Sequence, residues 1–145
     1  MAITGFILKD QDDREVNLDN FKGKKYLLSF HPMAWTSVCA FQMQDLEARY
    51  DLFMDRGITP FGVSIDHQFS KKAWAESLGV KRLRMLADFW PHGALAESLG
   101  CFIAKAGISG RQNYLIGPDG EVLWTVRHEI KERPDFDAIL KEMPA

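Results

Sequence analysis

The chain has 145 residues, of which 46% are hydrophobic, 26% charged and 12% aromatic, a length and composition typical of one globular domain. Its 18 basic and 20 acidic residues give a net charge of −2, which provides no positive field for nucleic acid or anionic lipid. The longest apolar runs, residues 26–30 and 58–65, are far shorter than the roughly 20 residues of a membrane helix. Residues 1–5 show no basic segment ahead of an apolar run, so we expect no signal peptide and a cytoplasmic protein. We expect a single domain over residues 1–145 without a nucleic-acid or membrane partner.

The first half of the chain indicates a hairpin, a buried strand and a long helix. Residues 6–8 and 15–17 flank a polar turn and predict an N-terminal β-hairpin. Residues 26–30 are a short apolar run typical of a buried strand. A helix is then predicted to start at residues 37–39 and to stop at Gly57, because apolar residues recur at helical spacing: Val38, Phe41, Leu46, Tyr50 and Phe53.

Strands and helices continue to alternate in the middle of the chain. Residues 59–65 predict a strand, and a helix is expected over 70–78 with Ser70 as its N-cap. A short strand at 85–87 and a short helix at 93–99 follow.

The end of the chain indicates a second hairpin and a closing helix. Residues 114–116 and 122–126 bracket Gly-Pro-Asp-Gly at 117–120, a strong turn signal. A helix is expected to begin near Pro134, with an apolar stripe of Phe136, Ile139, Leu140 and Met143. This order predicts an α/β protein with a thioredoxin-like fold, in which helices cover both faces of a mixed central sheet that carries an N-terminal hairpin.

The segment between the first buried strand and the long helix is the strongest candidate for chemistry. It places Cys39 in the first turn of that helix, where unpaired N–H groups and the helix dipole stabilise a thiolate. Thr36 supplies a hydroxyl that can donate a hydrogen bond to a small oxygen-rich ligand. Pro32 has no N–H and a fixed φ, so it can form a wall of the pocket. Cys39 is therefore a candidate nucleophile.

Pro32, Thr36 and Cys39 reproduce the P-x-x-x-T-x-x-C signature of peroxiredoxins (AhpC/TSA), thiol-dependent peroxidases of the thioredoxin superfamily. The chain resembles most the one-cysteine, alkyl hydroperoxide reductase E-type branch. Asp-Phe-Trp-Pro-His-Gly at 88–93 is similar to a segment of that branch, and Trp35 agrees with it.

The resemblance implies a site and a reaction. The family's arginine corresponds to Arg111, whose guanidinium can stabilise the thiolate and bind a peroxide oxygen. Thr36, Val38, Cys39 and Arg111 are then the substrate-binding residues, and Cys39 reduces hydrogen peroxide or an organic hydroperoxide and becomes a sulfenic acid. No metal or organic cofactor is expected. Many relatives carry a glutamate where this chain has Gln42, whose neutral amide can still form hydrogen bonds.

Cys101 is the one candidate resolving cysteine, because the chain has two cysteines in all. It lies between Gly100 and the apolar pair Phe102-Ile103, which favours a buried structural thiol. We therefore expect an external reductant for Cys39: a low-molecular-weight thiol, a glutaredoxin-like protein or thioredoxin.

Three other functions remain open. The first is a two-cysteine peroxidase in which Cys101 is the resolving cysteine. The second is a redox sensor or holdase-like interaction module in which oxidised Cys39 is the signal. A thiol–disulfide oxidoreductase is the third, although that chemistry typically uses C-x-x-C and this segment has one sulfur.

The sequence also gives expectations for the burial, dimer contacts and metal binding of several other residues. Trp35, Phe41 and residues 89–91 are either core or, as the family resemblance implies, the surface of a homodimer. Lys71 and Lys72 are expected to be solvated. None of the four histidines has metal-ligand spacing: His31, His67, His92 and His128. The position of His31 beside Pro32 makes it a candidate for tuning the pocket.

Overall fold

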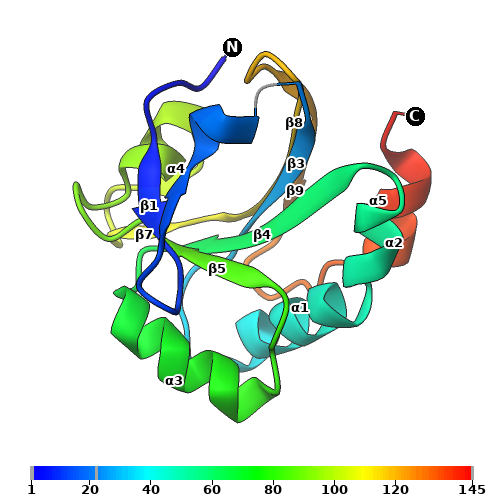
Figure 1. Cartoon of the computed structure of the whole chain (residues 1–145). Coiled ribbons are helices and arrows are strands. Elements are labelled where there is room, and N and C mark those ends of the chain that lie inside the picture. Colours follow the sequence, from blue (N-terminus) through cyan, green and yellow to red (C-terminus); the bar gives the residue numbers. More distant parts are fainter. Residues whose placement is uncertain (1, 22, 145) are drawn as a thin grey trace.

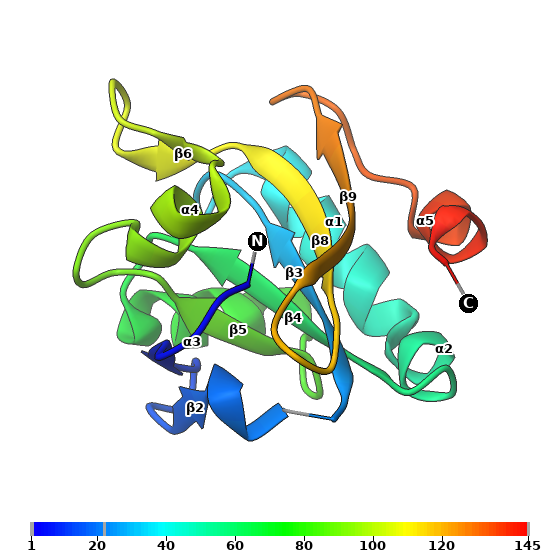
Figure 2. The ribbon, with the colours of Figure 1, turned by 90° about the horizontal axis from the view of Figure 1, so that it is seen from above.

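The computed structural model describes residues 2–21 and 23–144, and its centre is a mixed seven-stranded sheet with the order β2-β1-β5-β4-β3-β8-β9 (Figures 1 and 2). The strands of this sheet are β1 (Ile7–Lys9), β2 (Glu15–Asn17), β3 (Lys25–Phe30), β4 (Ile58–Ser64), β5 (Arg84–Ala87), β8 (Arg111–Ile116) and β9 (Val122–His128). A separate ribbon pairs β6 (Phe102–Ile103) with β7 (Ile108–Ser109). The helices are α1 (Ser37–Ala48), α2 (Tyr50–Met54), α3 (Gln68–Leu78), α4 (Ala94–Leu99) and α5 (Phe136–Glu142), with a 3₁₀ turn η1 at Leu18–Phe21.

Strand β3 lies at the centre of the sheet and joins its two halves. It pairs in parallel with β4, which pairs in parallel with β5, and it pairs antiparallel with β8. The two predicted hairpins are present as the antiparallel pairs β1–β2 and β8–β9. The mixed sheet expected from the sequence is therefore confirmed.

Alternating side chains of the central strands fill two separate hydrophobic cores. Leu27 of β3 and Leu115 of β8 pack with α1, α2, α3 and α5, whereas Leu28 and Tyr114 pack with α4 and the N-terminal hairpin. Successive residues of a strand point to opposite faces, so these clusters lie on the two sides of the sheet. Figure 2 shows α4 across the sheet from α1 and α5. The prediction of helices on both faces is confirmed.

Two details of the predicted helices are wrong. The long helix divides at Arg49 into α1 and α2. Helix α3 begins at Gln68, and its N-cap is His67, whose Nδ1 accepts a hydrogen bond from the backbone N–H of Phe69 at 3.2 Å. Ser70 lies inside this helix, where its hydroxyl accepts a hydrogen bond from the Trp35 indole at 3.0 Å.

The expectation that Lys71 is solvated is also wrong. Lys71, Trp74 and Ala75 stand three and four residues apart on α3 and form its buried face, while Lys72 is exposed. Within residues 2–21 and 23–144, no helix is both long enough and apolar enough to cross a membrane.

Candidate active site

Cys39 occupies the first turn of α1, as the sequence predicted. Thr36 is the N-cap in extended conformation, so Cys39 is the third residue of the helix, among backbone N–H groups that have no partner within the helix. The Cys39 side chain is fully buried, with 0% exposure. Water therefore does not solvate a charge on this sulfur, and the protein itself must stabilise a thiolate.

Arg111 supplies a positive charge in direct contact with that sulfur. Its side chain is buried at the start of β8, and Nη1 lies 3.4 Å from Cys39 Sγ. Nε and Nη2 both donate to the backbone carbonyl of Ile130, at 3.0 and 2.6 Å. The guanidinium is held on two sides, so its charge is fixed in position against Cys39.

Gln42 orients Arg111 from the next turn of α1. Its Oε1 accepts a hydrogen bond from Arg111 Nη1 at 2.7 Å, while its Nε2 donates to Ser29 Oγ at 2.8 Å and to the carbonyl of Phe30 at 3.2 Å. The neutral amide thus forms the hydrogen bond we expected of it. It holds the arginine without adding a negative charge beside Cys39.

A pocket of about 270 Å³ leads to the sulfur. It brings the sequence-predicted site residues together, and its lining consists of Pro32, Met33, Thr36, Ser37, Val38, Cys39, Ile108, Arg111, Ile130 and Lys131. The Thr36 hydroxyl donates to the carbonyl of Met33 at 2.8 Å. Its lone pairs therefore remain free to accept a hydrogen bond from a protonated ligand oxygen, the reverse of the donation we expected from the sequence.

The segment that carries this pocket has one unusual backbone conformation. Trp35 has a φ of 71°, in the left-handed region that a large side chain rarely adopts. Two hydrogen bonds fix the segment around it: the Trp35 indole to Ser70, and the Ala34 N–H to Asp66 Oδ2 at 2.7 Å.

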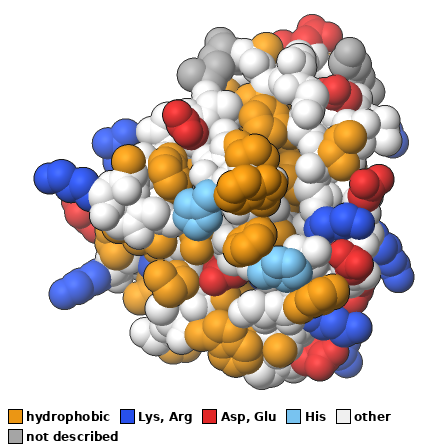
Figure 3. All heavy atoms as spheres, turned by 90° about the vertical axis from the view of Figure 1, so that its left-hand side faces the viewer, with side chains coloured by type: hydrophobic (Ala, Val, Ile, Leu, Met, Phe, Trp, Pro, Cys, Tyr) orange, Lys and Arg blue, Asp and Glu red, His pale blue; other side chains and the backbone are white. Residues whose placement is uncertain are grey.

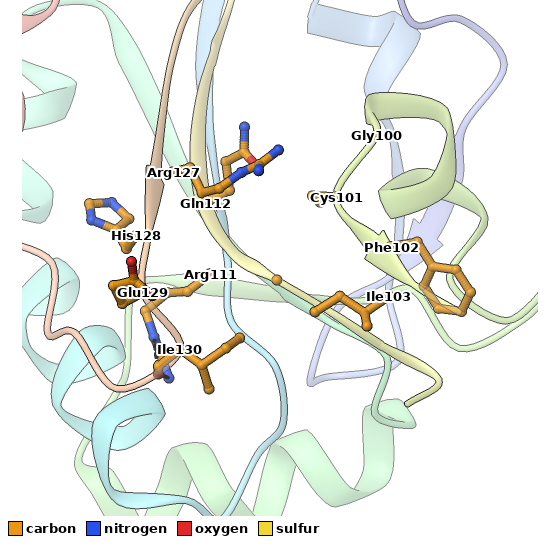
Figure 4. Close-up of a pocket in the computed structure, with 11 residues that line it drawn as sticks. Gly100, Cys101, Phe102, Ile103, Arg111, Gln112, Arg127, His128, Glu129 and Ile130 are labelled. Atoms are coloured by element: carbon orange, nitrogen blue, oxygen red, sulfur yellow. Dashed lines mark hydrogen bonds between the residues drawn. The ribbon is translucent and has the colours of Figure 1, made fainter. Parts of the chain in front are cut away.

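Cys101 lines a second pocket, of about 310 Å³, which shares Arg111 and Ile130 with the first (Figure 4). In Figure 4 the Arg111 side chain runs toward Ile130, away from Gln112 and Arg127 at the other end of the pocket. Burial raises the pKa of the Cys101 thiol to about 12. Cys101 packs in the core on the α4 face and Cys39 in the core on the opposite face, so the structure does not bring the two sulfurs together.

Two buried ionisable side chains adjoin the site. His31 precedes Pro32 and has 0% exposure, and burial together with the charge of Lys71 holds its pKa well below the usual value. Lys71 is fully buried as well, and burial lowers its pKa to about 8. Sequence reasoning missed Lys71, although its spacing of three residues from Trp74 was a signal that it shares the apolar face of α3.

The fold and the site define a thioredoxin-like protein with a cysteine and an arginine in contact at a helix N-terminus. Residues 2–125 match the model of the AhpC/TSA family, and the chain belongs to this family. The resemblance to peroxiredoxins is thereby confirmed. Membership identifies the chain as an oxidoreductase of the peroxiredoxin type.

Named relatives and solved structures agree with this assignment. The chain is 32% identical over 116 residues to alkyl hydroperoxide reductase E of Mycobacterium tuberculosis, a match that covers 79% of this chain and 75% of the relative. It is 30% identical to alkyl hydroperoxide reductase C of Staphylococcus haemolyticus, covering 79% and 61%. The crystal structure of Enterococcus faecalis AhpC superposes with a TM-score of 0.87 at 22% identity, covering 99% and 89%, which confirms the fold. The reduced 2-Cys peroxiredoxin of Plasmodium vivax gives a TM-score of 0.86 at 25% identity, covering 96% and 76%.

Proposed function

We propose that this chain is a thiol peroxidase that reduces hydrogen peroxide and organic hydroperoxides, with Cys39 as the nucleophile. The observation that carries the proposal is the contact of 3.4 Å between Arg111 Nη1 and Cys39 Sγ at the end of a pocket. A guanidinium is permanently charged, so it favours the thiolate at neutral pH. It also has donor capacity for a peroxide oxygen that enters the pocket.

The reaction is a displacement at oxygen. The Cys39 thiolate attacks one peroxide oxygen, an S–O bond forms, and the O–O bond breaks. The departing oxygen takes the electron pair and a proton and leaves as water or an alcohol, while Cys39 becomes a sulfenic acid. Arg111 and the N–H groups of Val38 and Cys39 stabilise the moving charge, and Thr36 accepts from the protonated oxygen. Pro32 closes the pocket without offering a competing donor.

An external thiol then returns Cys39 to its reduced form. The first thiol attacks the sulfenic sulfur, releases water and forms a mixed disulfide, and a second thiol frees Cys39. The burial of Cys101 on the other face of the sheet supports an external reductant rather than a resolving role for Cys101. Thioredoxin, a glutaredoxin-like protein and a low-molecular-weight thiol are the candidate reductants.

We also propose a single domain over residues 1–145, a homodimer and a cytoplasmic location. One sheet that takes strands from residue 7 to residue 128 supports the single domain. A reactive cysteine that must be reduced again after each turnover suits a reducing compartment such as the cytoplasm. The dimer is supported by large exposed aromatic side chains: Trp35, Phe69, Phe89 and Trp90. Figure 3 shows a face on which hydrophobic side chains gather with histidine side chains among them.

Two measurements test the proposal: the intact mass of the protein after peroxide treatment and the steady-state consumption of peroxide. Reduced protein treated with one equivalent of hydrogen peroxide is expected to gain one oxygen atom, and a sulfenate-specific trap is expected to label Cys39. The Cys39→Ser variant gains no oxygen, whereas Cys101→Ser reacts like the unmodified chain. If Cys39 stays accessible to alkylation but takes up no oxygen, the proposal is wrong.

Turnover with a panel of thiols separates the remaining alternatives. Steady-state peroxide consumption is expected with at least one thiol and unchanged in Cys101→Ser. Loss of turnover in that variant would establish a resolving cysteine instead. A sulfenate that forms but is not reduced by any of the thiols would favour the redox sensor over the peroxidase.

A further inference from the structure

A buried lysine without a partner lies behind the candidate active site. Among the described residues, three buried side chains have a polar atom with no hydrogen-bond partner, and two of them are Lys71 Nζ and His31 Nε2. Both side chains have 0% exposure. A buried ammonium group without a partner is costly, and the mechanism above does not use this one.

Packing connects Lys71 to the segment that carries Cys39. His31 immediately precedes Pro32, and its ring lies 5.4 Å from the ring of Trp74. Trp74 follows Lys71 by one turn on the buried face of α3, and it shares a hydrophobic core with Cys39. Ser70, next to Lys71, accepts the hydrogen bond of the Trp35 indole at 3.0 Å, so this part of α3 lies against the pocket-forming segment, and Lys71 is on its buried face.

The carboxylates near Lys71 are held by other groups. Asp66 Oδ2 accepts from the Ala34 N–H at 2.7 Å and from Ser64 Oγ at 2.6 Å. Asp88 accepts from the N–H groups of Leu95 and Ala96, each at 2.9 Å. Among the described residues, Lys71 Nζ has neither carboxylate as a hydrogen-bond partner. The charge of Lys71 is thus left without a direct partner.

Five titratable or charged groups act on or around Lys71. Asp66, Asp88 and Cys39 each favour its charged form. Burial lowers the pKa of His31, and the positive charges of Lys71 and Arg111 lower it further, so His31 stays neutral. Since attraction between charges is mutual, a cation that Cys39 stabilises in turn stabilises the Cys39 thiolate.

We infer that Lys71 is a positioning residue for the peroxidase reaction, whose buried ammonium group stabilises the Cys39 thiolate through the protein interior in addition to Arg111. The inference rests on the proposed function of Cys39. Lys71 does not touch the peroxide, and it acts only through the charge of the sulfur.

Lys71 loses its charge at alkaline pH. Burial lowers the pKa of Lys71 to about 8, so Lys71 is mostly protonated at neutral pH and loses its charge as the pH rises through about 8. The stabilisation of the Cys39 thiolate by Lys71 is therefore expected below about pH 8 and is lost as the pH rises through that value.

The test compares Lys71→Met with Lys72→Met, which removes the same charge from the neighbouring exposed position. The ultraviolet absorbance of the Cys39 thiolate, taken against Cys39→Ser, is measured from about pH 5 to about pH 9. In Lys71→Met the thiolate population is expected to fall by on the order of tenfold on the acidic limb of the curve. In Lys72→Met the thiolate curve is expected to be unchanged. An unchanged thiolate curve in Lys71→Met would overturn the inference.

A second measurement needs no substitution at Lys71. The NMR titration of the Lys71 side chain is expected to have a lower midpoint in Cys39→Ser than in the unmodified chain, because the thiolate no longer stabilises the ammonium. Equal midpoints would contradict the inference. Neither the absorbance nor the NMR titration uses peroxide, so a failure of the proposed peroxidase activity is seen separately, as a thiolate that takes up no oxygen.

Discussion

Arg111 shows how one side chain joins three parts of the chain. Its guanidinium contacts Cys39 and Gln42 of α1 and the carbonyl of Ile130, which follows β9. Nη1 faces Cys39 and Gln42, while Nε and Nη2 face the Ile130 carbonyl, so the group cannot rotate without losing a hydrogen bond. A lysine at this position has one charged nitrogen on a flexible stem and cannot make these contacts together.

We therefore predict a large effect for Arg111→Lys. The second-order rate constant for Cys39 oxidation by hydrogen peroxide is expected to fall by about 100-fold or more, because one charged donor at the developing oxyanion is misplaced. Stopped-flow measurement of the rate checks this prediction. Arg127→Lys, on the far side of the second pocket, is the matched control and is expected to leave the rate within about twofold. A similar rate in both variants would contradict the role of Arg111.

At the scale of the elements, the sheet separates the two cysteines. Strands β3 and β8 direct alternate side chains to opposite faces, and Cys39 and Cys101 pack in the two different cores. Cys39 lies at the N-terminus of a long helix beside an arginine, whereas Cys101 follows α4 in apolar surroundings that raise the pKa of its thiol to about 12. The same functional group is thus given two different reactivities by its place in the fold.

This difference predicts selective alkylation. In the folded, reduced chain, iodoacetamide at about pH 8 is expected to modify Cys39 alone, because Cys101 stays protonated well above that pH whereas the Cys39 sulfur is in contact with the charge of Arg111. Mass spectrometry is expected to find one label in the native protein and two after denaturation. The Cys39→Ser variant is the control, with no label in the native state. Equal labelling of both cysteines would show that Cys101 is reactive.

The order of the elements and the central residues of the site could be predicted from the sequence, because both depend on patterns within short segments of the chain. Alternating apolar runs and turn residues mark the strands, and the spacing of Pro32, Thr36 and Cys39 places all three in one loop and one helical turn. The N-terminal end of α3 was placed incorrectly because the His67 ring replaces the expected Ser70 hydroxyl as the cap.

Features that depend on tertiary packing could not be predicted in the same way. Lysine is nearly always solvated, which outweighed the helical spacing of Lys71 from Trp74, and the assembled core shows that Lys71 faces inward. The left-handed conformation of Trp35 depends on hydrogen bonds from its segment to Ser70 and Asp66, which come from elsewhere in the chain. The contact between Arg111 and Cys39 joins residues 72 positions apart.

At the scale of the whole molecule, the surface carries several large aromatic side chains whose exposure to water is unfavourable. The sequence left open whether Trp35, Phe41 and residues 89–91 lie in the core, and the structure shows that the aromatic ones are exposed, Trp90 by 83%. Phe41 is partly covered by the guanidinium of Arg133, 4.6 Å from its ring. Trp35 and Phe69 lie near each other because Ser70, next to Phe69, holds the Trp35 indole.

A homodimer would bury this aromatic surface. A stable interface removes about 800 Å² per partner from water, and large aromatic side chains contribute most of the binding energy when they become fully desolvated. We predict that the unmodified chain sediments as a dimer at micromolar concentration. Trp90→Asp is expected to sediment as a monomer, because dimerisation would place an unpaired carboxylate inside an apolar contact.

The control for this prediction is Leu52→Asp, which introduces the same charge at an exposed apolar residue of α2, away from the aromatic side chains. It is expected to remain dimeric, since α2 lies at the end of the molecule that carries α5 (Figure 1). Sedimentation velocity over a range of concentrations measures both variants. Dissociation by Leu52→Asp with a dimeric Trp90→Asp would place the interface on α2, and a monomeric unmodified chain at every concentration would exclude the dimer. With the expected pattern, the hydrophobic surface that includes Trp90 is the contact between two copies of the chain.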